Sequence, residues 1–198
     1  MSETTSIKPI ETVYNGYRFR SRLEARWAVF FDTLGIRYEY EPEGFVLSDG
    51  TKYLPDFWLT DLHVWVEVKG NMTKEDKHKI EQFRDDHANA TKGLGDWSDG
   101  ALWVVGRIPS EEQLANDMYP YYYEWGDLVW SFDWDWPYIP CVCPVCGKPG
   151  IEYDGRGARV CAGCCDYDKG YTGTDIRVQM AYDAARQARF EHGETPSK

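Results

Sequence analysis

Hydrophobic residues recur at helical spacing in the first quarter of the chain. After Ser21, apolar side chains stand at positions 23, 27, 30, 31 and 34, and Gly35 follows the last of them. Ser21 and Glu24 have the spacing of a capping box, in which side chains bind the backbone N–H groups that open a helix. The pattern therefore predicts a helix that begins after Ser21 and ends at Gly35.

Shorter runs predict strands around that helix. Residues 14–20 contain the Asn15-Gly16 turn and then alternate aromatic with basic side chains, which is typical of a short strand or hairpin. Later runs are expected to form strands at residues 36–40, 53–59, 63–69 and 101–108, and residues 44–47 are a candidate for an extra strand. The last of them is continuously apolar, and so it predicts a buried central strand.

Two further helices complete the predicted order. Residues 73–90 are charged and have few apolar positions, among them Ile80 and Phe83, so we expect a helix with one face open to water. Another helix is expected at residues 174–190. The order helix, three strands, helix, strand predicts a mixed α/β core. No apolar run approaches the roughly 20 residues that span a bilayer, and no secretory signal opens the chain. We therefore expect a cytoplasmic protein without membrane contact.

Composition divides the chain into four segments. Residues 1–12 are polar and predict a flexible tail. Residues 13–140 are expected to hold the core, within which the acidic and aromatic residues 109–140 are expected to cover the sheet. Residues 141–173 are rich in Cys, Gly and Asp and predict a small appendage. Residues 174–198 are expected to form the last helix and a tail.

The net charge of −11 limits the partners of the chain. A chain with this charge repels a nucleic-acid backbone as a whole, so binding such a polyanion requires a local basic cluster. Arg18, Arg20 and Arg22 form one cluster that could bind backbone phosphates. The neighbouring aromatic residues Tyr14, Tyr17 and Phe19 can stack on bases. The alternative is that these arginines belong to an ordinary solvated surface.

Two carboxylates and a lysine stand on successive predicted strands. Glu67 and Lys69 are two positions apart, so in a strand they share a face, whereas Val68 points into the core. Ten residues separate Asp56 from Glu67, which is enough for two short adjacent strands. Two such carboxylates can hold Mg²⁺, and a nearby lysine can assist an attacking water. The pattern favours metal-dependent phosphodiester hydrolysis, and an exposed Glu–Lys pair is the alternative.

In the sequences Pro55-Asp56 and Glu67-Val68-Lys69, the chain resembles the PD-(D/E)xK nuclease superfamily. The resemblance covers about residues 14–108. It implies a restriction-endonuclease-like αβββαβ core, with Mg²⁺ or Mn²⁺ bound by Asp56, Glu67 and the Val68 carbonyl. It also implies that Lys69 assists the attacking water.

Glu24 fits a further part of this resemblance. Junction-resolving and transposon-end-cleaving members carry a glutamate on the helix before the strands, and Glu24 matches that position. The resemblance implies that Glu24 completes or orients the site. The capping box explains the same residue as a helix cap, and both interpretations stay open at this point.

Two C-x₂-C pairs lie in the predicted appendage, 14 residues apart. This spacing suits a tetrahedral structural Zn²⁺ in a zinc ribbon. The predicted zinc ligands are Cys143, Cys146, Cys161 and Cys164. Cys141 and Cys165 are left over, and either could replace a neighbouring ligand. Disulfide bonds are the alternative, which a cytoplasmic location disfavours.

Two functions of different classes follow from these patterns. The first is a Mg²⁺-dependent DNA endonuclease of a bacterial cell or phage-infected host, without a nucleotide cofactor, acting with a partner protein or as a homodimer. The second is a module on the same fold that binds nucleic acid or protein without cleaving it. The complete Asp, Glu and Lys set favours the first hypothesis, and the acidic net charge favours the second. Duplex, branched and single-stranded substrates are all compatible with the sequence.

Overall fold

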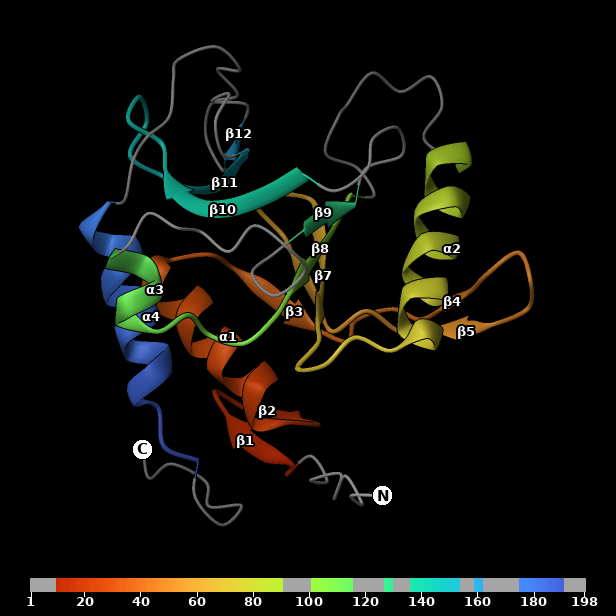
Figure 1. Ribbon diagram of the computed structural model, residues 1–198, viewed down its shortest axis with the longest axis horizontal. Coiled ribbons are helices and arrows are strands. Elements are labelled where there is room, and N and C mark those ends of the chain that lie inside the picture. The colour runs from red at the N-terminus through yellow and green to blue at the C-terminus, as the bar shows by residue number, and fades with distance from the viewer. Residues whose placement is uncertain are drawn as a thin grey trace.

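The computed structural model describes residues 10–90, 101–115, 127–129, 136–153, 159–161 and 175–190. In these residues the chain is a mixed α/β structure around an eight-stranded sheet (Figure 1). One face of the sheet packs on α1 (Arg22–Leu34) and α4 (Ile176–Gln187), which also pack on each other. The other face packs on α2 (Lys74–Ala90).

The central sheet combines antiparallel pairs with one parallel pair. Its strands, in spatial order, are β3 (Tyr38–Tyr40), β6 (Phe57–Leu59), β7 (Val64–Val68), β8 (Ala101–Val105), β9 (Asp127–Val129), β10 (Trp136–Val142), β11 (Pro149–Tyr153) and β12 (Arg159–Cys161). The parallel pair is β7 with β8, and a parallel pair requires a crossover connection. Helix α2 lies in that crossover. The predicted central strand is confirmed, because β8 lies between β7 and β9.

Local signals define the first helix. The Ser21 hydroxyl oxygen accepts a hydrogen bond of 3.2 Å from the N–H of Glu24 at the start of α1. At the other end, Gly35 has φ +81°, and its N–H donates to the Asp32 carbonyl. A glycine adopts this left-handed conformation at little cost, so it ends the helix cleanly. The predicted bounds of this helix are confirmed.

Two hairpins flank the central sheet. The first joins β1 (Thr12–Tyr14) to β2 (Tyr17–Phe19) through Asn15 and Gly16, which both have positive φ, as a tight hairpin turn requires. The second pairs β4 (Phe45–Val46) with β5 (Lys52–Tyr53).

The strand predicted at residues 53–59 is divided in the structure. Its first part belongs to β5, in the separate β4–β5 hairpin, and its second part is β6, in the central sheet. Pro55 lies between the two parts. Because proline has no N–H to donate to a strand ladder, a single strand through this position is disfavoured. The prediction of one continuous strand was therefore wrong.

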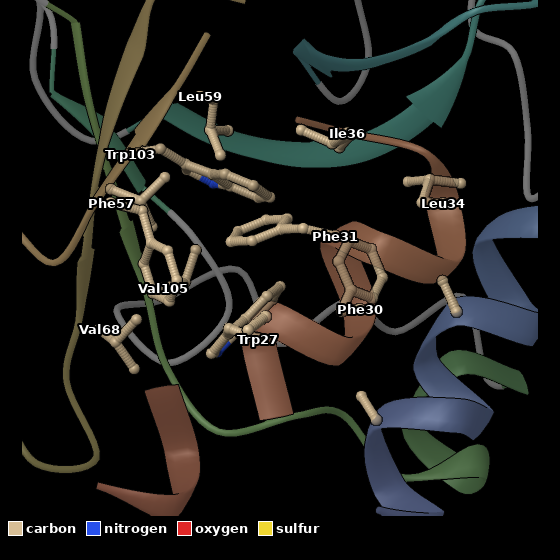
Figure 2. Close-up of a cluster of buried hydrophobic side chains, with 14 of the residues drawn as sticks. Trp27, Phe30, Phe31, Leu34, Ile36, Phe57, Leu59, Val68, Trp103 and Val105 are labelled. Atoms are coloured by element: carbon tan, nitrogen blue, oxygen red, sulfur yellow. The ribbon is translucent and has the colours of Figure 1, made fainter. Parts of the chain in front are cut away.

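The main core lies between the sheet and α1. Figure 2 shows Trp27 and Phe31 of α1 packed towards Trp103 and Val105 of β8 and Phe57 of β6. Each of these side chains is at most 1 % exposed. Full burial of one large apolar side chain contributes about 1.5–3 kcal/mol. The indole N–H of Trp27 donates to the Gly106 carbonyl at 2.8 Å, so its polar edge is satisfied inside the core.

A second core lies on the opposite face of the sheet. Trp65 of β7 and Leu102 of β8 pack there with Ile80 and Phe83 of α2. Strand β7 is consequently buried along its whole length. Glu67, whose side chain shares the face of Trp65, is a carboxylate in an otherwise apolar strand.

The sheet continues into the cysteine-rich segment. Strand β10 pairs with β9 on one side and with β11 on the other, so it crosses the domain boundary predicted after residue 140. Within residues 109–140, α3 (Glu111–Ala115) is followed by β9 and β10, which extend the sheet instead of covering it. Residues 116–126 and 130–135 of that segment lie outside the described part. None of the helices in the described part is long and apolar enough to cross a membrane.

Candidate functional site

Backbone hydrogen bonds place Asp56 beside β7. The N–H of Asp56 donates to the Val66 carbonyl at 3.0 Å, and Asp56 Oδ2 accepts from the Val68 N–H at 2.7 Å. These two bonds hold the carboxylate of Asp56 against the strand that carries Glu67. Asp56 is 7 % exposed and Glu67 is 3 % exposed, so both carboxylates are buried at the ends of adjacent strands.

Lys69 and Tyr53 each contact one carboxylate oxygen of Glu67. Lys69 Nζ lies 2.6 Å from Glu67 Oε1 and 3.2 Å from Asp76 Oδ1. The Tyr53 hydroxyl donates to Glu67 Oε2 at 2.9 Å. Burial raises the pKa of Glu67, whereas Lys69 and Tyr53 oppose that shift. Burial alone would lower the pKa of Lys69, but the charges of Glu67 and Asp76 raise it above its usual value. Lys69 therefore stays protonated.

Glu24 reaches this region from the first turn of α1. Its Oε2 accepts hydrogen bonds from the Arg20 N–H at 3.0 Å and from the Tyr40 hydroxyl at 2.6 Å. Its Oε1 accepts from the Ser21 hydroxyl at 2.6 Å. Burial, followed by the contact with Glu24, raises the pKa of Tyr40, so Tyr40 remains a neutral donor. Glu24 thus takes part in the helix cap and is also held by a residue of β3.

The charges of the other two carboxylates affect Asp56. Burial raises the pKa of Asp56 well above its usual value, and the negative charges of Glu67 and Glu24 raise it further. The Val68 N–H and Lys69 act in the opposite direction. The structure therefore brings the four predicted residues Glu24, Asp56, Glu67 and Lys69 into one electrostatic cluster.

The carbonyl of Val68 points to the same region. The N–H and C=O of a strand residue are directed to the same side, and the Val68 N–H is bound to Asp56. In the described part of the chain, no three His, Cys, Asp or Glu residues form a complete metal-binding group. Mg²⁺ does not require such a group, because it is usually held by one or two carboxylates together with waters and substrate phosphates.

The three arginines predicted to bind nucleic acid have different surroundings. Arg18 pairs with Glu11 at 3.1 Å, and Arg20 pairs with Glu41. The Nε atom of Arg22 is buried and has no hydrogen-bond partner among the described residues. Two of the three charges are thus already neutralised by carboxylates.

Three residues of the site were not predicted from the sequence. Tyr53 and Tyr40 donate to Glu67 and Glu24, and Asp76 is the second partner of Lys69. The spacing of Thr73 and Asp76 is a usable signal, because they form reciprocal hydrogen bonds at the start of α2. No comparable pattern marks the tyrosines, whose contacts depend on how β3 and β5 approach the site.

The cysteine segment forms the turn expected at its first C-x₂-C pair. The N–H of Gly147 donates to the Cys143 carbonyl at 2.8 Å, and Gly147 has φ +71°. Cys161 is the last residue of β12 and lies opposite Gly150. Because β10 and β12 run in the same direction on either side of β11, Cys143 and Cys161 lie at the same end of the sheet. Cys146, the second predicted ligand, is exposed. The fourth predicted ligand, Cys164, and the left-over Cys165 lie outside the described residues.

Comparisons with models of protein families, with curated proteins and with solved structures found no match to this chain.

Proposed function

We propose that the chain is a metal-dependent endonuclease that hydrolyses phosphodiester bonds in DNA. The observation that carries this proposal is a buried cluster of charged side chains. Asp56 lies just before β6, Glu67 lies near the end of the adjacent strand β7, and Lys69 lies 2.6 Å from Glu67. The order α1, β3, β6, β7, α2, β8 supports the resemblance to PD-(D/E)xK nucleases. Buried carboxylates with raised pKa values, such as Asp56 and Glu67, are typical of a functional site.

The residues present fit a divalent cation. Asp56, Glu67 and the Val68 carbonyl offer the oxygen donors that Mg²⁺ and Mn²⁺ accept. The unfavourable burial of Asp56 beside two other carboxylates favours a positive ion at this place. When bound, the cation polarises a phosphate oxygen and lowers the pKa of water.

The other side chains of the cluster have separate tasks in this proposal. Lys69 stays protonated, so it stabilises negative charge that develops on the phosphate and orients the attacking water. Asp76 holds the lysine from α2, and Tyr53 holds the second oxygen of Glu67. Glu24 contributes its charge from α1 and orients the site on the side of Asp56.

A binding module without cleavage is the second candidate. Two observations favour it: the net charge of −11, and the pairing of Arg18 and Arg20 with carboxylates. Such a module has no need for a charged lysine held between two carboxylates. We therefore place it second.

The test is cleavage of a panel of linear, supercoiled, branched and single-stranded DNA with Mg²⁺ or Mn²⁺. Wild type is compared with Glu67→Gln, and Glu75→Gln on the exposed side of α2 is the matched control. We expect metal-dependent cutting by wild type and the control, and none by Glu67→Gln. Binding without cutting would favour the module. Cutting by Glu67→Gln at the wild-type rate would contradict the proposed site.

We further propose that the cysteine-rich segment holds one structural Zn²⁺ through Cys143, Cys146, Cys161 and Cys164. Support comes from the tight turn that begins at Cys143 and from the position of Cys161 at the same end of the sheet. Four thiolates in two C-x₂-C pairs are a common tetrahedral zinc site. The metal content of the purified protein, measured by elemental analysis, tests this directly.

A further inference from the structure

A pocket of about 790 Å³ lies where the first turns of α1 meet the end of α4. Its lining residues are Arg26, Arg186, Gln187, Ala188 and Arg189. Three of the five are arginines and none is acidic, although the whole chain carries a net charge of −11. We call this the arginine pocket. Its local charge is opposite to that of the molecule as a whole.

Two of these arginines have no partner in the described part of the chain. Arg186 donates to the Pro109 carbonyl and pairs with Asp183. Arg26 and Arg189 have no such contacts among the described residues, and the Arg26 Nε atom is buried without an acceptor. A buried donor without a partner is destabilising. An anion in the pocket would supply the missing acceptor.

The guanidinium groups identify the class of anion. Arginine presents a planar fork of donors that matches the oxygens of phosphate, and it remains charged at all physiological pH values. Arg22 lies one turn before Arg26 on the same side of α1, and its Nε is also buried without a described partner. The two arginines extend the basic surface along the helix.

The pocket and the carboxylate cluster are separate sites that both include residues of the first turns of α1. Glu24 and Arg26 are two positions apart, so their side chains lie on nearly opposite sides of α1. A helix with its side chains is about 10–12 Å across. The same end of α1 abuts the end of β7, because Leu23 lies against Gly70, the residue after Lys69. Helix α1 therefore contributes residues both to the carboxylate cluster and to the arginine pocket.

We infer that the arginine pocket binds backbone phosphates of the nucleic acid that is cleaved at the carboxylate cluster. This inference rests on the proposed function, since it takes the same nucleic acid as the ligand. Contacts of this kind position the strand and are independent of base sequence. They also account for how so acidic a chain binds a polyanion.

The test is the salt dependence of DNA binding by the full chain. Fluorescence anisotropy of labelled duplex and single-stranded oligonucleotides is recorded over a series of NaCl concentrations, with Ca²⁺ in place of Mg²⁺. A gel verifies that the recovered DNA is intact. The variants are Arg26→Gln/Arg189→Gln, the charge-retaining Arg26→Lys/Arg189→Lys, and the exposed single variant Arg189→Gln. The control is Arg37→Gln/Lys52→Gln, which removes two exposed charges elsewhere.

Each lost phosphate contact lowers the slope of log K against log salt by about 1. We expect the slope to fall by about 2 in the double glutamine variant and by about 1 in Arg189→Gln. The lysine variant and the control should keep the wild-type slope. Equal slopes in the double glutamine variant and the control would overturn the inference, as would the absence of DNA binding by wild type.

The cleavage assay separates this inference from the proposed function. Lower slopes in the glutamine variants, with no cleavage by any protein, would support the arginine pocket and contradict the nuclease. Metal-dependent cleavage by wild type with unchanged slopes in all variants would overturn the arginine pocket and leave the nuclease intact.

Discussion

Lys69 bridges two carboxylates that come from different elements: its Nζ lies 2.6 Å from Glu67 of β7 and 3.2 Å from Asp76 of α2. Its side chain is 26 % exposed, so it is partly accessible to water. The bridge attaches the first turn of α2 to the end of β7. It also keeps a positive charge beside the buried cluster.

Replacing Lys69 by Met should lower the cleavage rate at least 100-fold. The variant removes the charge that opposes developing negative charge on the phosphate, and losing one such preorganised group costs about 10²–10³ in rate. The matched control is Lys79→Met, which breaks an ion pair with Glu75 on the surface of α2. Single-turnover cleavage measures both variants. A wild-type rate in Lys69→Met would contradict the proposed mechanism.

Asp56→Asn should stabilise the metal-free protein while abolishing cleavage. The variant removes a buried charge that lies near Glu24 and Glu67, and the amide oxygen can still accept from the Val68 N–H. In a chain of this size each kcal/mol gained raises Tm by about 2–4 °C. Thermal unfolding in the presence of a chelator measures this gain. A lower Tm for Asp56→Asn would contradict the destabilising effect of the charge.

The gain from Asp56→Asn should depend on pH. The pKa of Asp56 is raised in the folded chain, so its stabilising contribution is complete below the pKa of the unfolded chain. That contribution is lost as pH rises through the folded pKa. The difference in Tm between the variant and wild type should therefore widen from acid to neutral pH. Mg²⁺ should narrow it, because a cation that binds only the folded wild type stabilises it.

Local signals made α1 predictable, and alternation along β7 made one contact of the site predictable. Ser21 and Gly35 act within a few residues of the helix ends, so their effect is readable from the sequence. Glu67 and Lys69 lie on one face because alternate strand residues do so in any sheet. These inferences need no knowledge of how distant segments pack.

The contacts that were missed depend on tertiary packing. Tyr53 reaches Glu67 from the separate β4–β5 hairpin, and this hairpin follows from the interruption at Pro55. Strands β9 and β10 add to the sheet although their sequence lacks a clear period of two. Short strands of this kind are defined by their neighbours more than by their own residues.

Loss of zinc should increase hydrogen exchange at one end of the sheet. Cys143→Ala should lose bound zinc and increase hydrogen exchange in β10 and β11, because the turn after Cys143 would no longer be held by a metal. Exchange in β7 should change little. Cys141→Ala is the matched control, since Cys141 is a buried cysteine of β10 and lies two residues before Cys143. Zinc retained in Cys143→Ala but lost in Cys141→Ala would show that Cys141 is the ligand.

Glu24 has two interpretations that two variants can separate. Glu24→Gln removes the charge but retains hydrogen bonding, because its amide oxygen can accept from the Arg20 N–H and Tyr40 while its amide group faces the Ser21 hydroxyl. Ser21→Ala keeps the charge of Glu24 but removes the cap oxygen that accepts from the N–H of Glu24. Loss of such a cap costs about 1 kcal/mol.

Glu24→Gln should lower cleavage at least tenfold with little change in Tm, since the charge of Glu24 acts on Asp56 across the cluster. Ser21→Ala should lower Tm by about 2–4 °C and retain most of the cleavage rate. Single-turnover rates and thermal unfolding, measured on both variants, test this pair of expectations. If Glu24→Gln cleaves like wild type while Ser21→Ala is destabilised, Glu24 is a helix cap only. The catalytic cluster would then consist of Asp56, Glu67 and Lys69.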